Sequence, residues 1–263
     1  MNIIVCIKQV PDTNEVKTDP KTGTLIREGV PSIINPDDKN ALEEALKIKD
    51  RNPDTKVTVL TMGPPQAEVA LKETIAMGAD ESILLSDRAF AGSDTLATST
   101  VLATAIKKIE NFDIIFCGRQ AIDGDTAQVG PQIAEHLGIP QITYVEKLEI
   151  EDGKIRVRRA LEDGYFVIES KMPVLLTAIN ELNKPRYPSI KGIYEAYEED
   201  KVKVWSAEDI DGDIESIGLD GSPTQVSKSF APSSKKGEGE IFKGDTKAAV
   251  ENLIIRLRER KII

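Results

Sequence analysis

Short runs rich in apolar residues alternate with amphipathic segments along the first half of the chain, and this alternation constrains the fold more than any other feature. Such runs, bounded by polar residues, are typical of buried parallel strands. The segments between them carry apolar residues at helical spacing, which indicates helices that pack on a sheet. The pattern therefore predicts an α/β fold with a doubly wound, mostly parallel, Rossmann-like sheet. We expect its strands at residues 3–7, 57–61, 82–85 and 113–117.

Capping signals mark the helices between these strands. Asn35 is suited to an N-cap and Pro36 to a first helical position, so a helix is expected to begin there. Glycine after a periodic segment is a common helix end. The other helices are expected at about 66–77 before Gly78, from about 93–95 onward, and at about 126–137 before Gly138.

The second half of the chain changes character. Runs at 155–159, 165–169 and 174–178 predict strands, which we expect to extend the sheet as antiparallel edge strands. Helical periodicity is absent from Asp209 to Gly244 and returns in the final stretch. We therefore expect an α/β domain over residues 1–208 and an extended arm with a terminal helix over 209–263. Composition leaves two interpretations of the arm open: it wraps a partner subunit, or it is a tail before a helix that packs on its own domain.

Charge and run length exclude several functional classes. The formal net charge of −10 argues against a nucleic-acid binder, because phosphate neutralisation needs basic surface. No apolar run approaches the roughly 18 residues of a membrane span, so no membrane association is expected. The first apolar run is too short for a secretory leader. Each of the two cysteines, Cys6 and Cys117, lies in an apolar run as a small core residue, which favours a reducing cytoplasm.

The most informative segment for function spans residues 117–130, which leave a predicted strand, pass two glycines and enter a predicted helix. Ligands of open parallel sheets bind outside the carboxyl ends of the strands. Backbone N–H groups and the positive end of a helix favour an anion there. Arg119 adds a forked positive charge, whereas Asp123 and Asp125 are expected to bind ribose hydroxyls or to cap the helix. A plain polar loop with helix caps is an equally good interpretation of this segment by itself.

Two further segments reach the same edge of the predicted sheet. Residues 90–99 form a glycine-containing turn that opens a helix, and their hydroxyl groups suit a second cradle for a pyrophosphate. Routine helix capping explains that turn as well. The strand exits at 6–10 and 61–64 could flank an adenine ring or belong to the core.

Catalytic signatures are absent from the sequence. It contains no GxxxxGK[ST] or GxGxxG motif, and its single histidine and two cysteines offer no nucleophile elbow. A nucleotide-shaped site without acid–base machinery suits a protein whose chemistry belongs to a bound cofactor. We therefore expect no catalytic side chain and no metal.

Several motifs along the whole chain resemble the β subunit of electron transfer flavoprotein. They are the blocks that begin Val5-Cys-Ile-Lys-Gln-Val-Pro-Asp, Asn35-Pro-Asp-Asp, Thr61-Met-Gly-Pro-Pro, Ala76-Met-Gly-Ala-Asp, Gly118-Arg-Gln-Ala-Ile-Asp-Gly-Asp-Thr-Ala-Gln-Val-Gly and Leu182-Asn-Lys-Pro-Arg-Tyr. The segment at 90–99 is similar to that of the electron-bifurcating, FAD-binding branch in anaerobic bacteria.

The resemblance implies a heterodimer with an FAD-carrying α subunit. In ordinary members of the family the β subunit holds AMP; in the bifurcating branch it holds a second FAD that is reduced by NADH. One electron then goes to ferredoxin or flavodoxin, and the other goes through the α-subunit FAD to an acyl-CoA dehydrogenase-type partner. The chain would thus be an electron-transfer subunit. Two alternatives stay open: a non-bifurcating β subunit with AMP, and a stand-alone adenine-nucleotide sensor without a redox role.

The resemblance also implies which residues act. The cofactor would be held by Cys6, Asn35, Asp37, Met62, Gly118, Arg119, Gln120, Asp123, Gly124, Asp125, Thr126, Ala127, Gln128 and Val129, with Asp94, Thr95 and Thr98 added for FAD. The partner dehydrogenase would be contacted by Pro185, Arg186, Tyr187 and Ile190 in the segment 183–193, with Ile190 as the apolar residue that enters a partner pocket. Local packing is the alternative role for Ile190. The resemblance favours the interpretation in which the arm wraps the α subunit.

Overall fold

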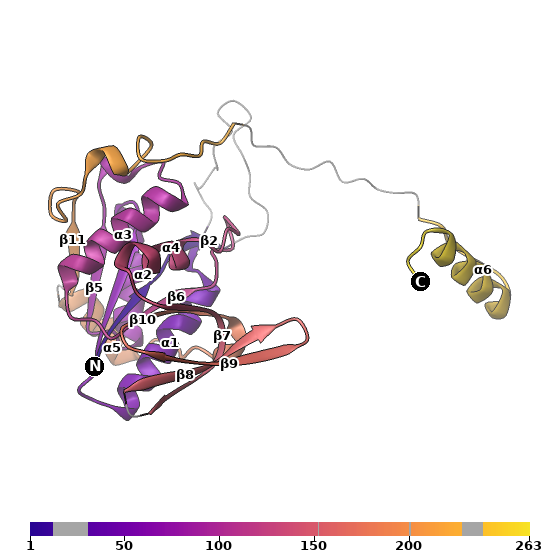
Figure 1. The fold of residues 1–263 in the computed structure, drawn as a ribbon, viewed down its shortest axis with the longest axis horizontal. Coiled ribbons are helices and arrows are strands. Elements are labelled where there is room, and N and C mark those ends of the chain that lie inside the picture. Colours follow the sequence, from indigo (N-terminus) through magenta and orange to yellow (C-terminus); the bar gives the residue numbers. More distant parts are fainter. Residues whose placement is uncertain (13–30, 152, 200, 228–238) are drawn as a thin grey trace.

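The computed structural model describes residues 1–12, 31–151, 153–199, 201–227 and 239–263, and a large central sheet dominates it (Figure 1). The strands of the sheet are β1 (Asn2–Cys6), β4 (Lys56–Met62), β5 (Glu81–Leu85), β6 (Ile114–Gly118), β7 (Gln141–Glu151), β8 (Lys154–Leu161), β9 (Gly164–Lys171), β10 (Val174–Ala178) and β11 (Val202–Trp205). Their spatial order is β11-β5-β4-β1-β6-β10-β7-β8-β9. The strands from β11 through β7 pair in parallel, and β8 and β9 follow as antiparallel strands. The predicted doubly wound α/β fold is confirmed.

Helices cover both faces of the sheet. On one face lie α1 (Pro36–Arg51), α2 (Glu68–Met77) and α5 (Ile190–Glu198), whose buried residues join one core cluster. On the other face lie α3 (Thr95–Ile109) and α4 (Val129–Leu137), which share a second cluster. Strand order reverses between β1 and β6, so the carboxyl ends of these two strands form the topological switch point where ligands bind in such folds.

The second half of the chain corrects one expectation and adds elements. Strand β10 is not an antiparallel edge strand: all five of its residues are buried, and it pairs in parallel with β6 and β7. Four of its five residues are apolar, as burial on both faces requires, and the exception is Thr177. The elements β7, β11 and α5 were not predicted from the sequence. Strand β11 is a short parallel edge strand next to β5, and α5 packs on α2.

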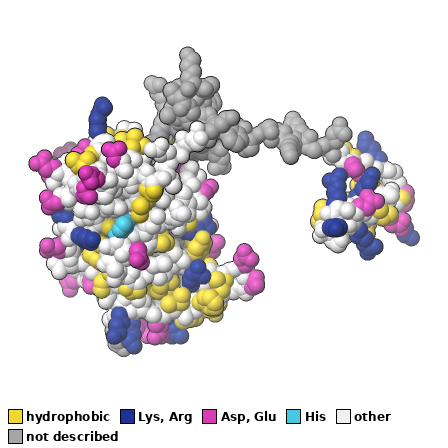
Figure 2. All heavy atoms as spheres, turned by 45° about the horizontal axis from the view of Figure 1, so that its top comes forward, with side chains coloured by type: hydrophobic (Ala, Val, Ile, Leu, Met, Phe, Trp, Pro, Cys, Tyr) yellow, Lys and Arg dark blue, Asp and Glu magenta, His cyan; other side chains and the backbone are white. Residues whose placement is uncertain are grey.

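The chain beyond residue 208 begins by packing on the domain. Ile210 and Ile217 belong to the cluster on the α3 face, and Ser222 is buried. Residues 228–238 of the expected arm lie outside the described residues. The terminal helix α6 (Thr246–Glu259) stands apart from the domain, has no buried residue, and carries both basic and apolar side chains (Figure 2).

A small antiparallel pair, β2 (Gln9–Pro11) and β3 (Ser32–Ile34), lies between β1 and α1 in the chain. Within the described ranges, no helix combines the length and the apolar character that crossing a membrane requires.

Candidate functional site

The switch point between β1 and β6 is built around the start of α1. The carboxylate of Asp38 accepts hydrogen bonds from two strand ends: from Lys8 N to Oδ2 at 2.7 Å and from Gly118 N to Oδ1 at 3.0 Å. Burial raises the pKa of Asp38 to about 7, although these hydrogen bonds and the side chain of Asn35 favour the charged form. Asp38 was not among the predicted site residues, because an acidic residue in a first helical turn suggests only a favourable interaction with the helix dipole.

Asn35 positions the loop that follows β6. It precedes α1 as predicted, but its side chain makes no capping bond. Instead, its Nδ2 donates to Gln120 O at 2.9 Å and its Oδ1 accepts from Ile122 N at 3.1 Å. A residue predicted as a helix cap therefore fixes the path of the candidate phosphate loop.

Two ion pairs involve this loop. Lys8 Nζ contacts both carboxylate oxygens of Asp123 at 2.7 and 2.8 Å. Arg119 Nε lies 3.3 Å from Asp37 Oδ2, and neither of these buried atoms has a hydrogen-bond partner in the described part of the chain. Burial raises the pKa of Asp37, and the guanidinium of Arg119 opposes that rise. The two cations reduce the negative charge that the acidic residues bring to the site.

Asp125 has a local partner as well. Gln120 Nε2 donates to Asp125 Oδ1 at 2.8 Å, inside the same loop. Together with the Lys8–Asp123 pair, this bond gives each of the two loop aspartates a protein partner. Whether either one also binds a ribose hydroxyl stays a prediction.

The start of α4 offers backbone donors that have no acceptor among the described residues. The helix begins at Val129 and not near Thr126, because Asp125 and Ala127 have φ values of 49° and 53°, which no α-helix can accommodate. The N-cap residue, Gln128, makes no side-chain capping bond to the first turn. Pro131 has no N–H group, so Val129 and Gly130 supply the donors of the first turn. Two such N–H groups at the positive end of a helix suit a phosphate.

The start of α3 is arranged differently. Asp94 Oδ1 accepts from Leu96 N at 2.9 Å and from Ala97 N at 3.1 Å, so two first-turn donors are already bound. Thr95 Oγ1 donates to Gln128 Oε1 at 3.1 Å, which joins the two helix starts. The Thr98 amide bonds to Asp94 O at 2.9 Å. The structure thus brings the predicted residues of both turns together. At the expected second phosphate cradle, however, the Asp94 carboxylate already accepts the N–H groups that a phosphate would use.

The floor of the site is apolar. Cys6 and Cys117, at the ends of adjacent strands, are both buried free thiols. A hydrogen bond with Cys6, together with burial, raises the pKa of Cys117, so this thiol stays protonated. Met62 is partly buried at the end of β4 and packs against the same cluster. No group of three or more potential metal ligands occurs within the described ranges.

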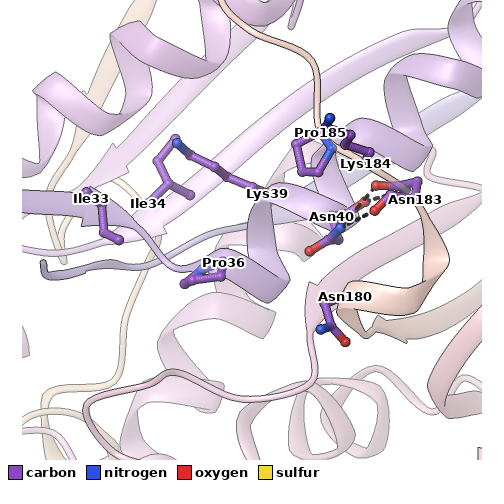
Figure 3. Close-up of a pocket in the computed structure, with 9 residues that line it drawn as sticks. All are labelled: Ile33, Ile34, Pro36, Lys39, Asn40, Asn180, Asn183, Lys184 and Pro185. Carbon is purple, nitrogen blue, oxygen red and sulfur yellow. Dashed lines mark hydrogen bonds between the residues drawn. The ribbon is translucent and has the colours of Figure 1, made fainter. Parts of the chain in front are cut away.

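The predicted docking segment lies further along α1, to which Asn183 and Arg186 are hydrogen-bonded. Tyr187 and Ile190 are 88% and 89% exposed, with Ile190 as the first residue of α5. A pocket of about 540 Å³ adjoins the segment and is lined by Ile33, Ile34, Pro36, Lys39, Asn40, Asn180, Asn183, Lys184 and Pro185 (Figure 3). Arg186 does not point into solvent; its guanidinium is paired with acidic residues of α1.

Comparison with known proteins identifies the family to which the chain belongs. A family model described as an electron transfer flavoprotein domain matches residues 22–209. The electron transfer flavoprotein subunit beta of Thermoanaerobacterium thermosaccharolyticum is 64% identical over 263 residues, with 100% of both chains covered. The caffeyl-CoA reductase-Etf complex subunit CarD of Acetobacterium woodii is 60% identical over 264 residues, and the acryloyl-CoA reductase electron transfer subunit gamma of Anaerotignum propionicum is 49% identical over 271 residues, each with 100% of both chains covered. The chain therefore belongs to the electron transfer flavoprotein family, whose β subunits it matches from end to end.

Proposed function

We propose that this chain holds an FAD at the switch point and works as the β subunit of a heterodimer whose α subunit carries a second FAD. NADH is the electron donor. One electron passes to a low-potential acceptor, ferredoxin or flavodoxin, and the other passes through the α-subunit FAD to an acyl-CoA dehydrogenase-type partner. The complex works in the cytoplasm, where reducing conditions keep Cys6 and Cys117 as the free thiols that the structure contains.

One observation carries the proposal: the start of α4 presents the N–H groups of Val129 and Gly130, without a side-chain cap from Gln128, at the point where strand order reverses. A phosphate there is stabilised by the helix dipole and by backbone donors. The buried thiols and Met62 provide an apolar floor beside it. These features fit an adenine nucleotide without requiring any catalytic side chain.

Bound FAD supplies the redox chemistry, and the chain's residues bind and orient it. Asn35 and Asp38 fix the path of the phosphate loop through their bonds to Gln120, Ile122 and Gly118. Arg119 and Lys8 hold positive charge at the loop, which favours a phosphate against the nearby aspartates.

The names of two relatives support the proposed partners. One relative belongs to a caffeyl-CoA reductase-Etf complex and another is an electron transfer subunit of acryloyl-CoA reductase. Both names pair electron transfer with a reductase that acts on a CoA thioester. For this chain we propose a partner of the same chemical class, which contacts Tyr187 and Ile190.

The terminal helix supports the proposed heterodimer. Val250, Leu253 and Ile254 recur at helical spacing, yet they are exposed. An apolar helix stripe of this kind is normally buried against another element. We propose that the α subunit covers it and that the preceding arm reaches around that subunit.

Cofactor analysis tests the proposal. The chain is co-expressed with its α subunit, and the flavin and nucleotide released from the purified heterodimer are quantified. Close to two FAD per heterodimer, together with bleaching of both flavins during an NADH titration, is the expected result. One FAD and one AMP, with no response to NADH, would overturn bifurcation. A stable monomer that binds nucleotide without an α subunit would favour the sensor alternative.

AMP is the second candidate, and one observation favours it. Asp94 already caps the start of α3 by binding the N–H groups of Leu96 and Ala97. A single open phosphate cradle, at α4, suits a mononucleotide. The cofactor analysis above distinguishes the two ligands directly.

A further inference from the structure

Arg186 makes a forked, three-part contact with α1. Its Nε lies 2.8 Å from Glu43 Oε2, and its Nη2 lies 3.1 Å from Glu43 Oε1 and 2.7 Å from Asp50 Oδ2. Its backbone N–H also donates to Glu43 Oε2 at 3.0 Å. One residue of the docking segment is therefore fixed to α1 through both its backbone and its side chain.

The Glu43 side of this contact is buried, so breaking the contact would leave an unpaired carboxylate inside the protein. Glu43 is only 5% exposed, and a buried carboxylate needs a charged, hydrogen-bonded partner. The bonds from Glu43 and Asp50 hold the pKa of Arg186 above its usual range. Lysine cannot reproduce the contact, because it has no planar fork that reaches two carboxylates.

A second set of hydrogen bonds to α1 lies three residues before Arg186, at Asn183. Asn40 Nδ2 donates to Asn183 O at 2.8 Å, and Asn183 Nδ2 donates back to Asn40 O at 3.0 Å. Asn183 Nδ2 also reaches Glu44 Oε2 at 2.9 Å. Figure 3 shows the two asparagines facing one another at the edge of the pocket. The chain before the exposed residues is thus fixed at two points along one helix.

The far side of the docking segment is fixed to α2. Ser189 N donates to Ala76 O at 3.1 Å, and Ser189 Oγ accepts from Gly192 N at 2.9 Å to cap α5. A Cβ at Gly192 would overlap Ala76 O, so α5 lies directly against α2. The exposed Tyr187 and Ile190 therefore lie in a segment held on both sides by helices of the domain.

We propose that Arg186 is a positioning residue for partner docking and not itself a docking contact. Its fork to Glu43 and Asp50 orders the chain that presents Tyr187 and Ile190. Side chains that are ordered before binding lose less conformational freedom when the complex forms. The inference rests on the proposed docking surface and adds to it the group that holds that surface in place.

The experiment compares three variants of the heterodimer: Arg186→Lys, Ile190→Ala and, as a control, Arg51→Lys. Arg51 lies at the exposed end of the same helix, outside the Arg186 network. KM and kcat for the flavoprotein are measured with a purified short-chain acyl-CoA dehydrogenase and its acyl-CoA substrate as the probe. Amide hydrogen exchange is followed at Ser189 and Ile193, whose N–H groups are bonded in the structure.

We expect Arg186→Lys to raise KM about three- to tenfold and to leave kcat unchanged. The docking segment would be less ordered in the free protein, so binding of the partner would have to order it at a cost in conformational entropy. Exchange at Ser189 and Ile193 should become faster in this variant. Ile190→Ala should raise KM roughly tenfold or more, as the loss of an apolar hot spot does, without faster exchange. The control should match the wild type.

Other outcomes separate the two proposals. A raised KM for Arg186→Lys without faster exchange would make Arg186 a direct contact and overturn the positioning role. An unchanged KM for Arg186→Lys, while Ile190→Ala raises KM, would also overturn it and leave the docking surface intact. If neither variant changes KM, the proposed docking surface is wrong, and the positioning role is overturned with it.

Discussion

Gly118 and Asp38 lie in direct contact where β6 meets the first turn of α1. A Cβ at position 118 would overlap the carboxylate of Asp38 and would lie 2.8 Å from its backbone nitrogen. The Gly118 N–H donates to Asp38 Oδ1 at 3.0 Å. The glycine therefore lets a helix approach the end of a strand. Its N–H group already has an acceptor within the protein, so it is not a free donor for a ligand.

The first prediction concerns Gly118→Ala. The added methyl group must displace either Asp38 or β6, so we expect a loss of about 1–3 kcal/mol in the free energy of unfolding. Gly124→Ala is the matched control. Apart from its chain neighbours, no described residue has an atom within 4 Å of a Cβ there, so its effect should stay within about 0.5 kcal/mol. Urea denaturation measures both. Equal stabilities of the two variants would contradict the close contact.

Gly124→Val should separate nucleotide binding from folding. The space around Gly124 is open, so the variant should fold normally, yet a branched side chain should crowd the path of the phosphate. We expect the heterodimer to lose its β-subunit nucleotide during gel filtration, as measured by analysis of the released nucleotide. Gly164→Val, equally uncrowded but in the β8–β9 hairpin, should retain it. Nucleotide retained by Gly124→Val would contradict the assignment of this loop.

Asp38→Asn should change how stability depends on pH. Burial raises the pKa of Asp38 from 3.8 to about 7, so the folded protein binds this proton more tightly than the unfolded chain does. The resulting stabilisation is complete below about pH 4 and is lost as the pH rises to about 7, by an amount on the order of 4 kcal/mol.

Asparagine stays neutral from pH 4 to pH 8, so the variant should lack this decline. Its amide NH2 group cannot accept one of the two backbone N–H bonds, which should lower the stability of the variant by the same amount at every pH. The difference in unfolding free energy between wild type and variant is measured by urea denaturation from pH 4 to pH 8. Asp37 and Cys117 are the titratable neighbours of Asp38, and both remain in the variant. Parallel curves for the two proteins would show that Asp38 does not titrate in this range.

Asp94 should contribute stability mainly as a helix cap. Asp94→Ala removes the bonds from Leu96 N and Ala97 N together with those from Thr224 N and Thr224 Oγ1, and we expect a loss of about 1–2 kcal/mol, mostly from the cap. Thr224→Val removes only the hydroxyl bond to Asp94 Oδ2, at an exposed position, and should cost less than about 1 kcal/mol. Thermal unfolding measures both changes. A larger loss for Thr224→Val would mean that the chain near residue 224 contributes more than the cap.

Local sequence patterns were enough to predict the first half of the fold. The doubly wound order, the start of α1 at Pro36 and the glycine residues that end α2 and α4 all follow from short-range rules on periodicity, capping and backbone freedom. The Asp94 cap of α3 follows from the same rules.

The predictions were wrong where the role or position of a residue depends on segments that are distant in the sequence. Asn35 carries the signal of a cap, but the loop after β6 uses its side chain. The start of α4 moved to Val129 because Asp125 and Ala127 adopt left-handed backbone conformations, which neither residue type predicts. Strand β10 was predicted at an edge because no local pattern shows that it is inserted between β6 and β7 in the sheet.

The sequence by itself determined most of the helices and strands of the first half of the chain, since periodicity and caps are properties of neighbouring residues, and it predicts the end of the sheet where a ligand is expected. Only the tertiary structure decided which polar groups are free. It occupies Asp38, Asp94 and Arg186 with bonds inside the protein and leaves the α4 start and Ile190 uncovered. The physical reason is that hydrogen bonds and burial depend on partners brought from elsewhere in the chain, and no local pattern encodes those partners.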